Sequence, residues 1–197
     1  MYSMRLKLRA WIGCLLLACA PAYAEDLTIT LTGQSMIRSD LRATAPDALP
    51  KIQPLLRGDV VFTNFEGAIA EPGQSVIGGG RGFLAPAEAL DALDTLGFNL
   101  LALSNNHAYD LGEPGIDNTL REVERREIAH AGVGATLEQA SSPAYLRVGD
   151  ITVALVASAS GLIADGGAAR TDHRGVNALR VLWADVATPA AEVPPPV

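Results

Sequence analysis

Residues 99–112 of the chain read NLLALSNNHAYDLG. The apolar run 100–103 is typical of a short strand that is buried on both faces of a parallel sheet. Open α/β sheets place their ligand sites just beyond the carboxyl ends of such strands. The polar side chains that follow this run therefore predict a functional site, without identifying its reaction; they are Ser104, Asn105, Asn106, His107 and Asp110.

Strand-like and helix-like segments alternate on both sides of this stretch. Period-two alternation and β-branched runs predict strands, and apolar residues at helical spacing predict helices. Pro54 should shorten or break the first helix, and Gly97 should close the second. The expected strands are 27–32, 59–63, 100–103 and 128–133, and the expected helices are 47–56, 86–96 and 115–127. This order predicts an α/β fold with a largely parallel sheet and flanking helices.

The remaining segments are shorter. Gly149-Asp150 is expected to join strands 145–148 and 151–157 through a II′ turn. The glycine-rich segment 71–82 and the polar segment 165–177 are expected to be loops.

Three other polar features have simple structural readings. Glu122 and Arg126 are expected to pair on the solvent side of their helix. His130 is interpreted as a strand histidine with its hydrogen bonds satisfied, and His173 as a solvent-exposed loop residue.

Length and composition indicate one globular domain with a tail. The chain has 197 residues, of which 49% are hydrophobic and 19% charged. Its net charge of -7 and the lack of a basic stripe argue against a nucleic-acid partner. We expect an α/β domain at residues 25–182 and an Ala/Pro-rich tail at 183–197.

The first 24 residues resemble a secretory signal peptide. A positive start precedes the apolar run 11–20, which is short for a membrane span, and Ala22-Tyr23-Ala24 forms a cleavage site. The expected mature protein starts at Glu25, has no transmembrane helix and is exported to the periplasm or cell envelope. Both cysteines would be removed with the signal. The alternative is a lipoprotein, because residues 16–19 also resemble a lipoprotein box with Cys19 lipidated.

Polar side chains follow three of the predicted strands, and parallel strands bring such ends to one sheet edge. They are Gln34, Asn64, Glu66, Asn105, Asn106, His107 and Asp110. Oxygen and nitrogen donors of this kind suit a divalent metal such as Mn, Zn or Fe, and the amides also suit a phosphate or carboxylate substrate. The spacing matches no complete metal or phosphate-loop motif. Two structural alternatives remain: Asn105 and Asn106 as helix caps or Asx turns, and Glu66 as a solvated loop acid.

A family resemblance adds to this reading. The segments 33–34, 59–66, 96–112 and 130–134 resemble the bacterial capsule-synthesis protein CapA family, and the Asn-Asn-His-x-x-Asp block is the most specific part. The family is associated with poly-γ-glutamate synthesis or export, and its fold is similar to that of calcineurin-like metallophosphoesterases, a sandwich of two sheets with flanking helices. The resemblance implies that Asn106 is a metal ligand and that His107 contacts a phosphate, and it places Glu66 on an Asn-x-Glu motif of the family. Together with the donor chemistry above, we expect Glu66, Asn106 and His107 to be metal ligands.

The remaining roles are expectations for the same strand ends. We expect His107 and Asp110 to be catalytic, and the amides Gln34, Asn64 and Asn105 to bind substrate. The family often has Gly-Asp where this chain has Gly33-Gln34, so metal binding should be weak. It also continues into a second half with further histidine motifs, so the chain resembles a C-terminally truncated member with an incomplete second half.

Two functions follow as hypotheses. One is a metallophosphoesterase-like hydrolase acting on a phosphate-containing or polymer-linked substrate. The other is a non-catalytic envelope protein that assists the assembly or export of an anionic polymer together with the capsule machinery.

Overall fold

The structure is a computed structural model, and it describes residues 26–181. The predicted signal peptide and the predicted tail lie outside the described residues, and the domain boundaries stay predictions. None of the helices in 26–181 combines the length and the hydropathy that a bilayer crossing requires.

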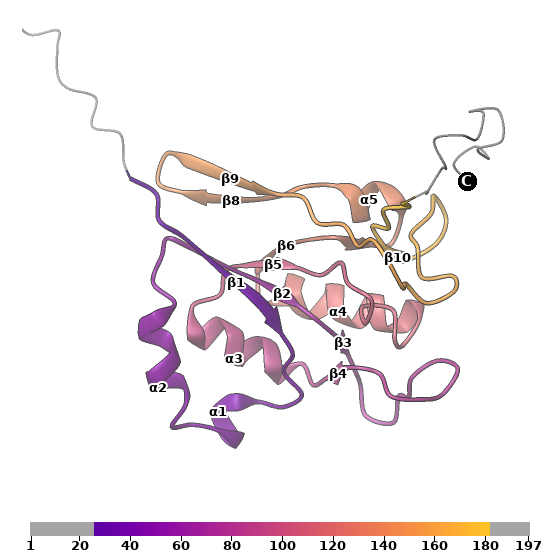
Figure 1. The fold of residues 1–197 in the computed structure, drawn as a ribbon, viewed down its shortest axis with the longest axis horizontal. Coiled ribbons are helices and arrows are strands. Elements are labelled where there is room, and N and C mark those ends of the chain that lie inside the picture. Colours follow the sequence, from indigo (N-terminus) through magenta and orange to yellow (C-terminus); the bar gives the residue numbers. More distant parts are fainter. Residues whose placement is uncertain (1–25, 182–197) are drawn as a thin grey trace, which may run out of the picture.

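A four-stranded parallel sheet forms the centre of the fold (Figure 1). Its strands are ordered β1-β2-β5-β6, and every neighbouring pair is parallel, as the alternating pattern predicted. β1 continues through Gln34, beyond its predicted end, with an irregular register between Leu31 and Gln34. The four strands are β1 (Ile29–Ser35), β2 (Val60–Phe65), β5 (Leu100–Ala102) and β6 (Ala129–Ala131).

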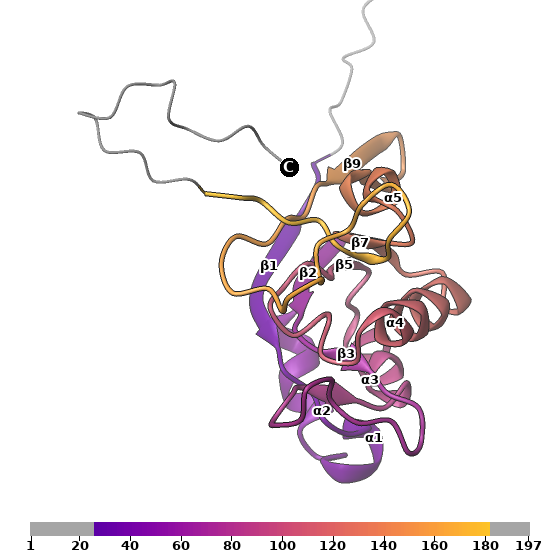
Figure 2. The same ribbon diagram turned by 90° about the vertical axis from the view of Figure 1, so that its right-hand side faces the viewer.

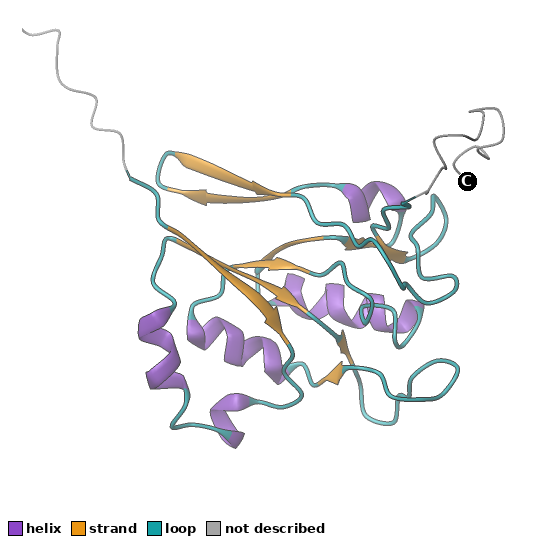
Figure 3. Ribbon diagram, in the orientation of Figure 1, coloured by secondary structure: helices purple, strands orange, loops and turns teal. Residues whose placement is uncertain are grey.

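Helices cover one face of this sheet, as Figure 3 shows. The two longest are α3 (Glu88–Leu96) and α4 (Glu113–Arg125), which begins slightly before its predicted start. Gly97 closes α3 with φ 95, as predicted. Pro54 also breaks its helix as predicted, because the segment divides into separate short helices. The short helices are α1 (Leu41–Thr44), α2 (Leu49–Ile52), the 3-10 turn η1 (Gln53–Leu55) and α5 (Leu137–Ser141).

Short strand pairs complete the described chain. The predicted hairpin is present, and Gly149 in its turn has φ 56, as a II′ turn requires. The prediction that 165–177 is all loop is wrong, because β10 pairs there with β7. The pairs are β3 (Ala68–Ile69) with β4 (Leu84–Ala85), β7 (Val133–Gly134) with β10 (Gly175–Val176), and β8 (Ala144–Val148) with β9 (Ile151–Leu155). The mixed α/β class is confirmed, and the full two-sheet sandwich stays a prediction.

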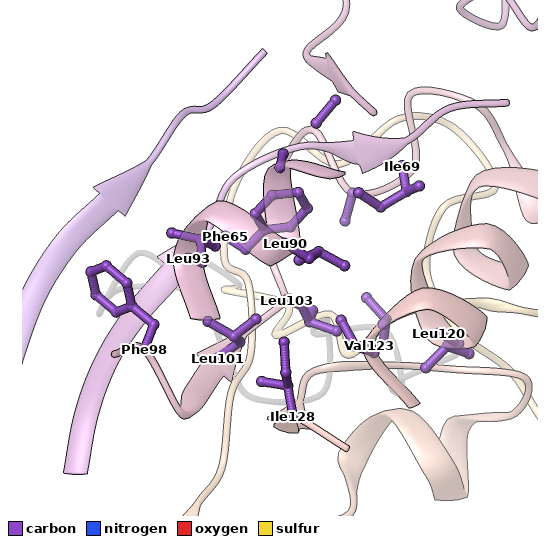
Figure 4. Close-up of a cluster of buried hydrophobic side chains, with 14 of the residues drawn as sticks. Phe65, Ile69, Leu90, Leu93, Phe98, Leu101, Leu103, Leu120, Val123 and Ile128 are labelled. Carbon is purple, nitrogen blue, oxygen red and sulfur yellow. The ribbon is translucent and has the colours of Figure 1, made fainter. Parts of the chain in front are cut away.

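The main hydrophobic core lies between the central sheet and the helices (Figure 4). Leu101 of β5, Leu90 of α3 and Ile116 of α4 are fully buried in it. Burial of each such side chain contributes about 1.5–3 kcal/mol. A smaller cluster of Ala102, Ala131 and Ala157 fills the opposite face of the sheet. Because both faces around β5 are packed, the polar residues after β5 emerge from a rigid base.

Candidate functional site

The site lies at the carboxyl edge of the central sheet. Gln34 and Asn64 are register partners in β1 and β2, and Asn64 is in turn paired with Ala102 at the end of β5. This pairing brings the predicted strand-end residues together. An open pocket of about 430 Å³ is lined by Gln34, Asn64, Glu66, Asn105 and Asn106, which come from three separate strand ends.

Glu66 is the buried carboxylate of this pocket. It is only 6% exposed, so the alternative of a solvated loop acid is wrong. Its Oε2 accepts hydrogen bonds from the Gln34 Nε2 and from the Asn64 Nδ2, the latter at 3.4 Å. These amide donors replace part of the water that a buried carboxylate loses. In this structure Gln34 and Asn64 therefore both serve Glu66 as hydrogen-bond donors.

Asn105 fastens the strand ends to one another. Its Nδ2 donates to the carbonyl of Phe65 at 2.9 Å, and its Oδ1 accepts the His107 N–H at 3.0 Å. The second contact is the Asx turn of the alternative reading. Asn105 is buried, whereas Asn106 is exposed and lines the pocket. Between the two amides, Asn106 is the one placed to meet a ligand.

His107 and Asp110 form a hydrogen-bonded pair, with 2.8 Å between the His107 Nδ1 and the Asp110 Oδ2. The same carboxylate oxygen accepts the Phe83 N–H at 2.6 Å. Such a carboxylate fixes the orientation of the ring and directs Nε2 outward, as for many catalytic or metal-ligating histidines. Neither His107 nor Asp110 is among the residues that line the 430 Å³ pocket.

An aromatic contact sits beside this pair. The Phe83 ring lies 6.0 Å from the His107 ring, centroid to centroid, and the Arg38 guanidinium stacks on Phe83 at 4.1 Å. Asp110 also accepts the Ile77 N–H at 2.9 Å through its backbone carbonyl. The glycine-rich segment 71–82 is therefore anchored to the site at both Ile77 and Phe83.

The donor set can be tested against the metal that the resemblance implies. The described residues include no group of three or more His, Cys, Asp or Glu side chains placed to share an ion. Glu66 is the carboxylate of the pocket, and amide donors already occupy one of its oxygens. A tight site normally needs about three protein ligands. The side chains of residues 26–181 do not fit a tight metal site by themselves, and weak binding stays a prediction.

The opposite wall of the pocket was not predicted from the sequence. Residues 158–163, just after β9, face Gln34 and Asn106 across the opening. Figure 2 shows this orange-to-yellow part of the chain crossing in front of β1, β2 and β5. The available signal was a run of small polar residues, Ser158-Ala159-Ser160-Gly161, directly after a strand.

The other two histidines have defined partners. His130 Nδ1 lies 2.7 Å from the Ile128 carbonyl, which confirms its reading as a satisfied strand residue. The prediction of a solvent-exposed His173 is wrong, because its side chain is only 25% exposed, with its Nε2 2.6 Å from the Gly166 carbonyl. Its Nδ1 lies 3.3 Å from Glu113, at the start of α4. His173 therefore connects the segment after residue 160 to the helix layer.

Tyr109 adds a further contact to His173, with 3.2 Å between its hydroxyl and Nε2. Burial, together with the Glu113 carboxylate, raises the pKa of Tyr109, so its hydroxyl stays protonated.

The fold and the pocket define an α/β protein with a candidate binding site at the carboxyl edge of its parallel sheet. Residues 28–190 match the family described as bacterial capsule synthesis protein PGA_cap. The chain belongs to this family, which confirms the resemblance drawn from its motifs.

The chain aligns with curated relatives over about a third of their length, and it is 30% identical to them in the aligned part. Two uncharacterized proteins of Sinorhizobium fredii, y4sH and y4uA, are 30% identical over 169 residues, which is 80% of this chain and 36% of each relative. A probable polyglutamine synthesis accessory protein of Mycobacterium tuberculosis is 30% identical over 125 residues, covering 62% of this chain and 33% of that protein. The chain thus spans about a third of the length of the relatives it matches.

Proposed function

We propose that this protein is exported and takes part in the synthesis or export of a capsule polymer of the poly-γ-glutamate kind by binding the polymer chain. Membership of the capsule synthesis family supports this proposal, as does the likeness to the probable polyglutamine synthesis accessory protein of Mycobacterium tuberculosis. The observation that carries it is a pocket lined by four side-chain amides and one buried carboxylate.

The chemistry of the pocket suits a polyamide. Side-chain amides both donate and accept hydrogen bonds, as the amide links of a polymer do. A lone buried Glu66 repels carboxylates, so the pocket should hold the neutral links of the chain rather than its charged groups. This favours a binding role over hydrolysis through two metals, because the pocket contributes a single carboxylate.

The binding proposal is tested with a labelled γ-linked glutamate oligomer and fluorescence anisotropy. Asn106→Ala should weaken binding several-fold, because Asn106 lines the pocket and is exposed. Gln53→Ala removes an exposed amide beside α3, outside the pocket, and serves as the matched control. Binding that is equal in the wild type and both variants would contradict the proposal.

A second candidate function is hydrolysis, and the 2.8 Å contact between His107 and Asp110 favours it. An imidazole oriented by a carboxylate can accept or deliver a proton at Nε2. This candidate function requires the complete metallophosphoesterase-like sandwich, in which the second half of the fold supplies further metal ligands. Hydrolysis of a generic phosphodiester, together with divalent metal in the purified protein, would favour it, provided that both activity and metal content fall in His107→Ala.

A further inference from the structure

A second cavity adjoins the amide pocket. Its volume is about 670 Å³, and it shares Ser160, Gly161 and Ile163 with the pocket. The two openings are therefore neighbours on either side of one segment. Two backbone hydrogen bonds hold the segment around Ala159 in place. The Leu179 N–H donates to the Ala159 carbonyl at 2.8 Å, and the Ala159 N–H donates to the Asn177 carbonyl at 2.9 Å.

Two arginines line the second cavity. Arg170 and Arg180 are both exposed, and Asp165 is the one acidic residue among the described residues of the lining. The lining therefore carries net positive charge in a chain whose overall net charge is -7. An exposed anionic chain would be repelled by much of this protein and attracted here.

These arginines differ from most others in the described residues. Six arginines form ion pairs with carboxylates, namely Arg42, Arg121, Arg125, Arg126, Arg147 and Arg174. Within residues 26–181, neither Arg170 nor Arg180 has a carboxylate oxygen within the 4.0 Å of an ion pair. With respect to residues 26–181, their guanidinium groups keep their donors for a ligand, and the planar fork of donors matches a carboxylate.

We propose that the cavity lined by Arg170 and Arg180 is a carboxylate subsite, which binds the side groups of the polymer whose amide links lie in the adjoining pocket. This inference rests on the proposed function. The amide pocket recognises a neutral repeating unit, and the arginines recognise the charge that accompanies each unit. A polyamide that carries regular carboxylates matches both chemistries, whereas a neutral polyamide matches the pocket alone.

The experiment compares two oligomers of the same length, one of γ-linked glutamate and one of its neutral α-carboxamide, γ-linked isoglutamine. Arg170→Gln/Arg180→Gln should weaken binding of the glutamate oligomer about tenfold, the sum of two exposed charge-assisted contacts. Binding of the isoglutamine oligomer should stay unchanged. Added salt should weaken glutamate binding to the wild type more than to the double variant, because the contacts are exposed and screened.

Arg57→Gln is the matched control. Arg57 is exposed, has no ion pair within the described residues, and precedes the amino end of β2, at the opposite edge of the sheet. This variant should bind both oligomers as the wild type does.

The possible outcomes separate the subsite from the proposed function. Glutamate binding that is unchanged in the double variant but weakened by Asn106→Ala would overturn the subsite and leave the proposed function standing. Equal loss of both oligomers in the double variant would also overturn it, because that loss indicates local damage. Polyphosphate that binds as tightly as glutamate and depends equally on both arginines would overturn the assignment to carboxylates. A wild-type protein that binds neither oligomer would overturn both proposals.

Discussion

Gln34 is the residue at which the metal prediction is tested most directly. The family resemblance leads us to expect a carboxylate at this position, whereas here an amide donates to Glu66. A carboxylate at this position would face Glu66 across the same gap, and two like charges so close together favour a cation between them.

We therefore expect Gln34→Asp to raise the affinity for Mn or Zn by roughly tenfold, within the range of such ligand changes. Glu66→Ala and His107→Ala should each lower the affinity, which we expect to be weak already in the wild type. Calorimetric titration of the four proteins measures these effects. Identical binding in all four, or tight binding that survives loss of both Glu66 and His107, would show that the metal prediction is wrong.

Gly82 controls the geometry of the His107–Asp110 pair. A Cβ atom added at Gly82 would lie 2.6 Å from the Asp110 Oδ2, closer than any normal contact. Gly82→Ala should therefore push Asp110 away from His107 and cost about 1–3 kcal/mol of stability through overpacking. The downfield proton NMR signal of a hydrogen-bonded Nδ1–H should disappear.

The matched control for this variant is Gly33→Ala, because an added Cβ at Gly33 meets nothing within 4 Å. A signal that persists in Gly82→Ala, or that is equally weakened in Gly33→Ala, would contradict the assigned role of Gly82.

At the scale of elements, Arg126 joins the two main helices. It follows α4, donates to Asp91 of α3, and lies 2.5 Å from Glu122 through its Nη1. Its side chain is only 8% exposed. The predicted pair of Glu122 and Arg126 is thus confirmed, but its placement on the solvent side is wrong, because the Arg126 side chain is buried between Glu122 and Asp91 of α3.

Hydrogen bonding to Arg126 lowers the pKa of both Asp91 and Glu122. A lowered pKa in the folded state gives stability that is fully present above the unfolded pKa and is lost as the pH falls through the folded one. Arg126→Met should therefore cost about 2 kcal/mol near neutral pH. The difference from the wild type should shrink below about pH 4, where the carboxyl groups become protonated.

Urea unfolding of both proteins at pH 6 and pH 3 measures this difference, and Arg57→Met serves as the control for loss of an exposed arginine. A difference of equal size at the two pH values would mean that packing of the side chain, rather than its ion pairs, stabilises the helices.

Local sequence patterns predict where helices and strands lie, but they do not predict which distant segments contact one another. Gly97 and Pro54 act within a few residues, so the end of α3 and the break after α2 could be read from the sequence. β10 could not be predicted from the sequence, because Val176 becomes a strand residue only by pairing with Val133 of β7. His173 was misread for the same reason, since its partners Gly166 and Glu113 belong to other segments.

In the candidate site, too, the residues at the strand ends could be predicted from the sequence, whereas the wall positioned by long-range pairing could not. Gln34, Asn64 and Glu66 were predicted to converge because parallel strand ends meet at one edge, and they share hydrogen bonds. The wall formed by residues 158–163 carries no charged side chain or motif, and the pairing of Ala159 with Ala178 puts it in place. The small residues at 158–161 could mark this segment, but the pairing that positions it joins residues far apart in the chain and cannot be predicted from the local sequence.

At the scale of the whole molecule, export is the property that the first residues predict. The mature protein should begin at Glu25, after cleavage behind Ala22-Tyr23-Ala24. N-terminal sequencing of protein recovered from the cell envelope checks this boundary.

Cys19→Ala distinguishes the two export routes. It should leave processing at Glu25 unchanged if the signal peptide is of the secretory kind. A mature chain that begins with lipidated Cys19, and that disappears in this variant, would replace the prediction with the lipoprotein reading.

The parallel arrangement of the central sheet has a consequence for how fast the protein folds. Ile29 pairs with Val60, Phe62 with Leu100, and Leu100 with Ala129. Each pairing closes a long loop, and the entropy cost of that closure comes before the stabilising contacts form. The hairpin of β8 and β9 is joined by a two-residue turn and can form early. Since the site exists only once β1, β2 and β5 have come together, ligand binding should recover on refolding with the slow phase of sheet assembly rather than with the first rise in secondary structure.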